Sequence, residues 1–173
     1  MPVSSYIVIV MGLPGSGKTF FARQLAAQLS AIHLSSDQIR QEKGLLGKYT
    51  LKDKLVVYRE LLSQAAYWLQ FQRPVLLDAT FHREMFRKLV EQFAQNQNMA
   101  LFYLRIVTNE STIKERVEKK RSDSQADYTV YQQLKKEMEP MKHSYLELES
   151  SEQNLKLMIR QAKDYIEHGL SSV

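Results

Sequence analysis

The stretch GLPGSGKT, residues Gly12–Thr19, follows directly on the apolar run YIVIVM, residues Tyr6–Met11. The run is rich in β-branched residues, which predicts a strand buried on both faces. The glycines that follow allow a tight turn in which successive backbone N–H groups point at one anion. The helix expected at Thr19–Leu29 adds the positive end of its dipole at the same place. The pattern GxxxxGK[ST] between a strand and a helix therefore predicts a loop that binds phosphate.

We expect the whole loop to contact a bound nucleotide; it consists of Gly12, Leu13, Pro14, Gly15, Ser16, Gly17, Lys18 and Thr19. Lys18 supplies a point charge for the β- and γ-phosphates and the Thr19 hydroxyl is a ligand for Mg²⁺. A later strand, VLLDAT, carries Asp78 near its end, and we expect its carboxylate to hold Mg²⁺ through water or to bond Thr19. The predicted cofactors are ATP and Mg²⁺.

Two sequence features that are missing indicate what the protein does with the nucleotide. Ala79 follows Asp78, so no adjacent glutamate is present to activate water as in many motor ATPases. The guanine-reading motif NKxD occurs nowhere in the chain. Both absences favour phosphoryl transfer to an acceptor other than water over mechanical hydrolysis or a GTP-dependent switch.

Strand-like and helical patterns alternate along the rest of the chain. We expect strands at residues 6–11, 31–36, 75–80, 99–107 and 155–159, and helices at 19–29, 36–42, 51–71, 83–95, 110–120, 128–141 and 161–168, with a loop at 122–127. This alternation implies right-handed crossovers and a parallel sheet of about five strands covered on both faces. The predicted fold is a three-layer α/β domain spanning residues 1–173, with its site beyond the carboxyl ends of the strands.

The composition is that of a globular domain. The 173 residues are 44% hydrophobic and 25% charged, a balance that suits one domain. No signal peptide or membrane span is recognisable, so we expect no membrane partner. The chain has no cysteine, which excludes disulfides and fits a cytoplasmic location. A net charge of +5 suits an anionic substrate and equally a solvated basic surface.

The acceptor side of the site is indicated by the stretch SSDQIR. It places Asp37 just after the second predicted strand, at the sheet edge where the phosphate loop lies. A carboxylate near the γ-phosphate can accept the proton of an attacking hydroxyl, so Asp37 is a candidate general base. The alternative is that Asp37 only caps the helix that begins here.

Four motifs in this order, GLPGSGKT, SSDQIR, LLDATFHR and ERVEKKR, resemble the AAA_33-type P-loop kinases, near the kinase domain of polynucleotide 5′-hydroxyl kinases. The resemblance covers roughly residues 5 to 140 and implies a nucleoside-monophosphate-kinase-like fold. It also implies ATP·Mg²⁺, transfer to a hydroxyl, Asp37 as base and Arg40 as a substrate or phosphate contact. Arg40 as a plain surface residue is the alternative. We expect Thr80 and Arg83 to line the acceptor pocket.

The resemblance further implies a mobile lid that bears arginines. Arg116 and Arg121 match that position, and the lid is expected at approximately residues 116–128. Arginine stabilises a phosphoryl group in transfer through planar, bidentate contacts, and a basic stretch that leads into a polar loop suits a segment closing over ATP. The alternative is a solvated helix face with ion pairs such as Glu115–Lys119.

The sequence thus predicts an ATP-dependent kinase with a hydroxyl acceptor. One alternative is a regulatory or partner module that binds ATP and hydrolyses it slowly or not at all. Another is a toxin-like kinase that acts on a nucleotide sugar. The acceptor is open: residues 40–54 are basic but offer only Tyr49 as an aromatic platform. A small molecule or mononucleoside is therefore favoured over nucleic acid.

Overall fold

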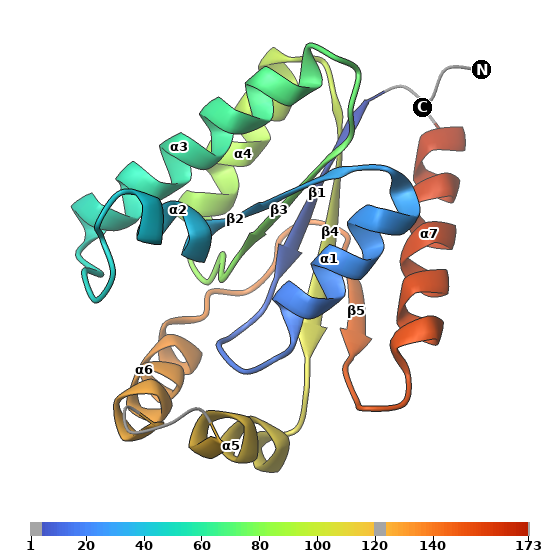
Figure 1. Ribbon diagram of the computed structural model, residues 1–173. Coiled ribbons are helices and arrows are strands. Elements are labelled where there is room, and N and C mark those ends of the chain that lie inside the picture. Colours follow the sequence, from blue (N-terminus) through green and yellow to red (C-terminus); the bar gives the residue numbers. More distant parts are fainter. Residues whose placement is uncertain (1–4, 120–123, 173) are drawn as a thin grey trace.

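A parallel β-sheet forms the centre of the computed structural model, which describes residues 5–119 and 124–172. The strands are β1 (Tyr6–Met11), β2 (Ile32–Ser35), β3 (Val75–Ala79), β4 (Ala100–Val107) and β5 (Leu146–Glu149). They are ordered β2-β3-β1-β4-β5, and every neighbouring pair is parallel. The predicted parallel sheet is confirmed, and β1 lies at its centre (Figure 1).

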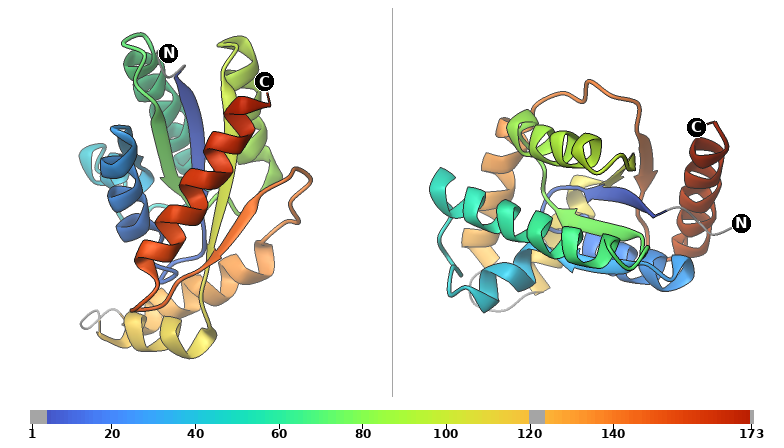
Figure 2. Two further views of the ribbon diagram at one scale, coloured as in Figure 1. Left: turned by 90° about the vertical axis from the view of Figure 1, so that its right-hand side faces the viewer. Right: turned by 90° about the horizontal axis from the view of Figure 1, so that it is seen from above.

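Helices cover both faces of the sheet. They are α1 (Lys18–Leu29), α2 (Ser36–Glu42), α3 (Leu51–Leu69), α4 (Glu84–Asn96), α5 (Glu110–Lys119), α6 (Ser124–Glu137) and α7 (Leu155–Ser171). Helices α3 and α4 pack on one face, and α1 and α7 pack on the other (Figure 2). The three-layer α/β architecture expected from the sequence is therefore present.

The central strand shows why the sequence folds this way. All six residues of β1 are buried. Ile7 and Ile9 pack in the core under α3 and α4, whereas Val8 and Val10 pack in the core under α1 and α7. Successive side chains of a strand point to opposite faces, so only an uninterrupted apolar run can serve both cores. The phosphate loop follows at the end of this strand.

The expected last strand is wrong. Residues 155–159 open α7, and the fifth strand lies earlier, at Leu146–Glu149. The segment LKLMI satisfies both the alternation of a strand and the spacing of a helix, and short apolar runs cannot be told apart by period alone. The structure follows the helical spacing, because Met158, Ala162 and Ile166 are buried while Leu157 is 43% exposed.

Smaller differences concern the segment around the expected lid. Helix α6 begins at Ser124, inside the loop expected at 122–127, and it ends at Glu137 rather than at residue 141. Within the described residues, no helix is long and apolar enough to cross a membrane.

Candidate active site at the carboxyl edge of the sheet

The phosphate loop turns from β1 into α1 through two residues with left-handed backbone angles. Gly15 has φ 79° and Gly17, at the N-cap position of α1, has φ 87°. These angles favour glycine. Gly12 is required for space instead, because a Cβ atom there would lie 2.6 Å from the Ile106 carbonyl oxygen. The loop thus keeps its backbone close to the sheet and presents the N-terminus of α1 to a ligand.

Two long-range contacts hold the loop from the other side. The Ser150 hydroxyl, which follows β5, donates to the Ser16 carbonyl at 2.6 Å. The Arg116 guanidinium, on α5, donates through Nη1 to the Gly15 carbonyl at 3.0 Å. Sequence reasoning found Arg116 but missed Ser150. The sequence indicates Ser150 only by its place directly after a strand. The sequence predicts that last strand at residues 155–159, whereas the structure has it at Leu146–Glu149.

Helices α5 and α6 lie beyond the carboxyl ends of the strands, next to the phosphate loop (Figure 1). Ile113 on α5 and Tyr131 on α6 are buried together, and Leu13 of the loop packs against them with Tyr128. A small apolar cluster therefore joins this helix pair to the loop. A lid at this place remains a prediction.

Of the two arginines expected in the lid, the structure places one. Arg116 reaches the phosphate loop. Arg121 lies outside the described residues, as do positions 120, 122 and 123 of the expected lid segment.

Asp78 is buried at the end of β3, with 1% of its surface exposed. Its Oδ2 atom lies 2.9 Å from His33 Nε2, and its Oδ1 atom has no hydrogen-bond partner among the described residues. A buried carboxylate oxygen without a partner is costly unless a ligand or water satisfies it. His33 was missed, although it stands on β2 two residues before Ser35, which pairs with Asp78 in the sheet.

This carboxylate fits the magnesium expected from the sequence. Mg²⁺ prefers oxygen ligands and keeps several waters beside substrate phosphates, so it does not need a cage made of protein groups alone. Among the described residues, no group of three or more His, Cys, Asp or Glu side chains that could hold a metal ion occurs. Thr19 lies in the first turn of α1, and its side chain makes no hydrogen bond with any described residue. Its hydroxyl is therefore available as a metal ligand.

Asp37 does not cap its helix. The N-cap position of α2 is Ser35, without a side-chain cap, and Asp37 lies in the first turn. Its side chain is exposed and makes no hydrogen bond or ion pair with a described residue. The alternative role as a helix cap is therefore wrong. The carboxylate is free at the sheet edge that also carries the phosphate loop.

Arg40 is buried, with 6% of its surface exposed, so it is not the surface residue considered above. Its Nη1 donates to the Lys48 carbonyl, and its guanidinium lies over the Tyr49 ring, 4.7 Å from the centroid. Arg40 thereby holds the segment between α2 and α3 against α2.

The segment that follows β3, with Thr80 and Arg83, has a strained backbone. Phe81 has φ 48°, which is rare for a residue other than glycine and costs roughly 1–2 kcal/mol. Its amide donates to the buried Tyr58 hydroxyl at 3.1 Å, and its carbonyl accepts from Arg87 Nη1 at 2.8 Å. Burial raises the pKa of Tyr58, which stays protonated. These contacts hold the segment in one conformation beside the site.

His82, in the same segment, is almost fully buried. Burial, together with the nearby Lys54 ammonium, lowers the pKa of His82 to about 4, so its ring is neutral at pH 7. The distance of 3.5 Å from its Nε2 to Glu137 Oε2 is therefore not an ion pair at that pH.

The buried imidazole predicts a loss of stability in mild acid. The unfolded ring has the higher pKa, near 6.5, so the unfolded state takes up a proton as the pH falls from 7 to 5 while the folded state does not. We expect this to lower the free energy of unfolding by about 2 kcal/mol, and His82→Gln to lack this part of the pH dependence. Denaturant unfolding at both pH values measures it, with the exposed His168→Gln as control. Equal pH dependence in the wild type and His82→Gln contradicts the prediction.

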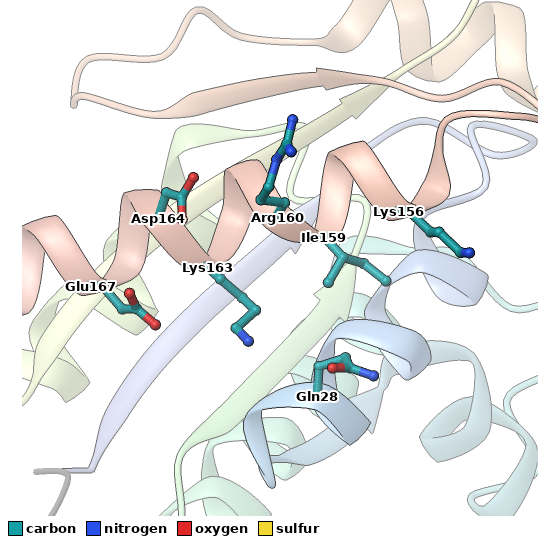
Figure 3. Close-up of a pocket in the computed structure, with 7 residues that line it drawn as sticks. All are labelled: Gln28, Lys156, Ile159, Arg160, Lys163, Asp164 and Glu167. Atoms are coloured by element: carbon teal, nitrogen blue, oxygen red, sulfur yellow. The ribbon is translucent and has the colours of Figure 1, made fainter.

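A separate surface hollow of about 450 Å³ lies between α1 and α7 (Figure 3). Gln28 of α1 and side chains of α7 such as Ile159 and Lys163 line it. None of its lining residues belongs to the phosphate loop or to the segments that follow β2 and β3. The catalytic groups expected from the sequence are therefore not in this hollow.

The parallel sheet, the phosphate loop and the helix pair beside it define the fold of a P-loop kinase. The chain belongs to the AAA_33 family, described as an AAA domain, whose family model matches residues 7–141. This confirms the resemblance found in the sequence.

Curated relatives are distant and longer. Uncharacterized proteins of Mycobacterium tuberculosis and Mycobacterium bovis are 27% identical over 123 residues, which is 64% of this chain and 25% of each relative. The match thus spans about a quarter of the length of these relatives.

Solved structures show the same fold over nearly the whole chain. The adenosine 5′-phosphosulfate (APS) kinase CysC of M. tuberculosis, in complex with AMPPNP and APS, superposes with a TM-score of 0.77 at 18% identity, covering 96% of this chain and 99% of that one. A gluconokinase of Sinorhizobium meliloti superposes with a TM-score of 0.66 at 18% identity, covering 99% and 94%. A sugar kinase of Janibacter superposes with a TM-score of 0.69 at 15% identity, covering 94% and 95%.

Proposed function

We propose that this protein is an ATP·Mg²⁺-dependent kinase that transfers the γ-phosphoryl group to a hydroxyl of a small molecule, with Asp37 as general base. The observation that carries the proposal is the free, exposed carboxylate of Asp37 in the first turn of α2. It lies at the same sheet edge as the phosphate loop. A module that only binds nucleotide has no need of such a group.

In the proposed reaction, the Asp37 carboxylate accepts the proton of the acceptor hydroxyl as its oxygen bonds to the γ-phosphorus. The bond from that phosphorus to the β,γ-bridging oxygen breaks, and ADP leaves. Lys18 and Arg116 stabilise the charge on the transferring oxygens. Thr19 and Asp78 would hold Mg²⁺, which when bound neutralises phosphate charge.

Two observations support a small acceptor. The structural neighbours include kinases named for small molecules, namely APS kinase, gluconokinase and sugar kinase. In addition, the basic segment 40–54 contains one aromatic residue, Tyr49, which is exposed but has the Arg40 guanidinium over one face of its ring. A single-stranded nucleic acid stacks successive bases on several aromatic side chains, so a 5′-hydroxyl end of a polynucleotide is the less favoured acceptor. We further propose a cytoplasmic location.

ADP release in the presence of ATP and Mg²⁺, measured across sugars, sugar acids, nucleosides and 5′-hydroxyl oligonucleotides, tests the proposal. A small molecule that raises ADP release and becomes phosphorylated supports it. ATP binding without transfer to any acceptor supports the regulatory module instead. Transfer to the oligonucleotide, with binding that weakens by about 0.7 log units per phosphate contact for each tenfold increase in salt, identifies a polynucleotide kinase.

Arg116→Lys is expected to lower kcat by about 10- to 100-fold with a smaller effect on ATP affinity, because lysine keeps the charge and loses the planar fork that matches phosphoryl oxygens. The structure supports this choice, since Nη1 of Arg116 already reaches the phosphate loop. Steady-state kinetics and nucleotide titration measure the two effects separately, with Arg105→Lys on β4 as control. Unchanged kcat in Arg116→Lys assigns the transition-state contact to another residue.

A further inference from the structure

Two consecutive carbonyl groups of the phosphate loop are bonded to side chains from distant segments. The Ser150 hydroxyl donates to the Ser16 carbonyl at 2.6 Å. Arg116 Nη1 donates to the Gly15 carbonyl at 3.0 Å and lies 3.5 Å from the Ser150 hydroxyl oxygen. The loop is therefore held by a pair of neighbouring polar side chains, of which Ser150 contacts both the loop and the other member.

Ser150 is itself held in place by the end of β4. Its amide donates to the Val107 carbonyl at 2.8 Å, and its carbonyl accepts from the Thr108 hydroxyl at 2.9 Å. The Ser150 side chain thus extends from a backbone that is bonded through both of its polar groups. Because this backbone is already ordered, the hydroxyl loses little further conformational entropy when it bonds to the loop. Ser150 can therefore define the position of the loop.

The bond from Ser150 sets the direction of one amide group in the loop. A trans peptide unit is planar, and its C=O and N–H groups point in opposite directions. No peptide bond among the described residues is cis. The Ser16 carbonyl shares its peptide unit with the Gly17 amide, so holding that carbonyl against Ser150 directs the Gly17 N–H away from Ser150.

The Gly17 N–H is available to a ligand. It donates to no other group in the described part of the chain, whereas the Ser16 N–H donates to the Leu13 carbonyl at 3.1 Å. Gly17 is the N-cap residue of α1, so its amide lies at a helix N-terminus, where phosphate groups bind. A Cβ atom at Gly17 would lie 3.4 Å from the Ser150 hydroxyl oxygen and 3.2 Å from Arg116 Nη1. Both side chains therefore lie directly against Gly17.

We propose that Ser150 is a positioning residue of the nucleotide site. Its hydroxyl fixes the peptide unit between Ser16 and Gly17 so that the Gly17 N–H is directed at the phosphates before the nucleotide binds. The inference rests on the proposed function for the presence of a nucleotide in the loop. An amide that is oriented in advance needs no reorganisation on binding. Phosphate affinity should therefore depend on a hydroxyl that does not itself contact the ligand.

Calorimetric titration with AMPPNP and with inorganic tripolyphosphate, each with Mg²⁺, tests this role without phosphoryl transfer. We expect Ser150→Ala to weaken both ligands by the same factor of about 3- to 10-fold, the scale of one hydrogen bond. Ser150→Thr keeps the hydroxyl and should bind both ligands like the wild type. Ser151→Ala is the matched control, because Ser151 is the exposed neighbour of Ser150 and only its backbone amide is bonded, to Asn154.

The Gly17 amide proton gives a second readout that a merely structural role would not change. In the wild type its NMR resonance should move downfield when AMPPNP and Mg²⁺ bind, because the N–H then donates to a charged phosphate oxygen. At saturating nucleotide this shift should be smaller in Ser150→Ala. Thermal unfolding shows whether each variant is folded. Ser150→Cys, which retains the packing but donates only weakly, should lose affinity in the same way as Ser150→Ala.

Several outcomes overturn the inference. They are no binding of either ligand to the wild type, unchanged affinity in Ser150→Ala and Ser150→Cys, an equal loss in Ser150→Thr, and an unaltered shift of the Gly17 amide. A loss for AMPPNP but not for tripolyphosphate also overturns it, because Ser150 would then contact the nucleoside. The expected pattern without phosphoryl transfer to any acceptor supports the role of Ser150 and contradicts the proposed kinase function instead.

Discussion

Lys18→Ala is expected to reduce ATP-dependent phosphoryl transfer by about 10³-fold or more, on the scale of removing a cation from a phosphoryl-transfer site. Lys18 is the first residue of α1, directly after the left-handed turn at Gly17. Lys18 therefore lies where the phosphate loop meets the N-terminus of α1. Without it, the β- and γ-phosphates keep only backbone N–H groups and the helix dipole. Measuring kcat/KM and ATP affinity together shows the size of the loss.

The fold of this variant should be intact. Lys18 is not among the buried core residues of either sheet face, so removing its side chain opens no cavity there. Circular dichroism and thermal unfolding check this. Lys156→Ala is a matched control, because Lys156 is an exposed lysine in the first turn of another helix, α7. Full turnover in Lys18→Ala, or an equal loss in the control, contradicts the assignment of the phosphate loop.

The fold follows from the sequence where one local pattern allows one structure. The run Tyr6–Met11 predicts a strand buried on both faces, and the glycine-rich turn after it predicts a helix directly behind it; both elements are present. The alternation of the remaining elements then requires a parallel sheet. The error at residues 155–159 arises where two periods fit the same five residues, and only packing against β4 and α1 decides between them.

The residues of the candidate site, like the elements of the fold, can be predicted only where a local pattern indicates them. Residues that carry their chemistry in a local motif, such as Lys18 or Asp37, can be proposed from the sequence. Residues that act through distant contacts cannot be. Ser150 meets Ser16 across 134 positions and Glu137 meets Arg83 across 54. A serine in a loop and a glutamate at a helix end have no local signal, because their roles depend on how separate segments pack.

The sequence allows two roles for Asp37, a general base or a helix cap, and the structure contradicts the helix cap. The remaining role makes a sharp prediction. Asp37→Asn should retain ATP·Mg²⁺ affinity and lower phosphoryl transfer by about 10²-fold or more, the contribution of a general base. Asparagine has nearly the same size as aspartate and cannot accept the proton. Because the Asp37 side chain makes no hydrogen bond or ion pair with a described residue, α2 should fold as before.

Single-turnover transfer and nucleotide titration separate chemistry from binding in Asp37→Asn. Glu42→Gln is the control, since Glu42 is an exposed carboxylate on the same helix and accepts a hydrogen bond from the Gln38 side chain. Transfer near the wild-type rate in Asp37→Asn would leave the carboxylate without a catalytic role and would shift the proton acceptor to another group of the site.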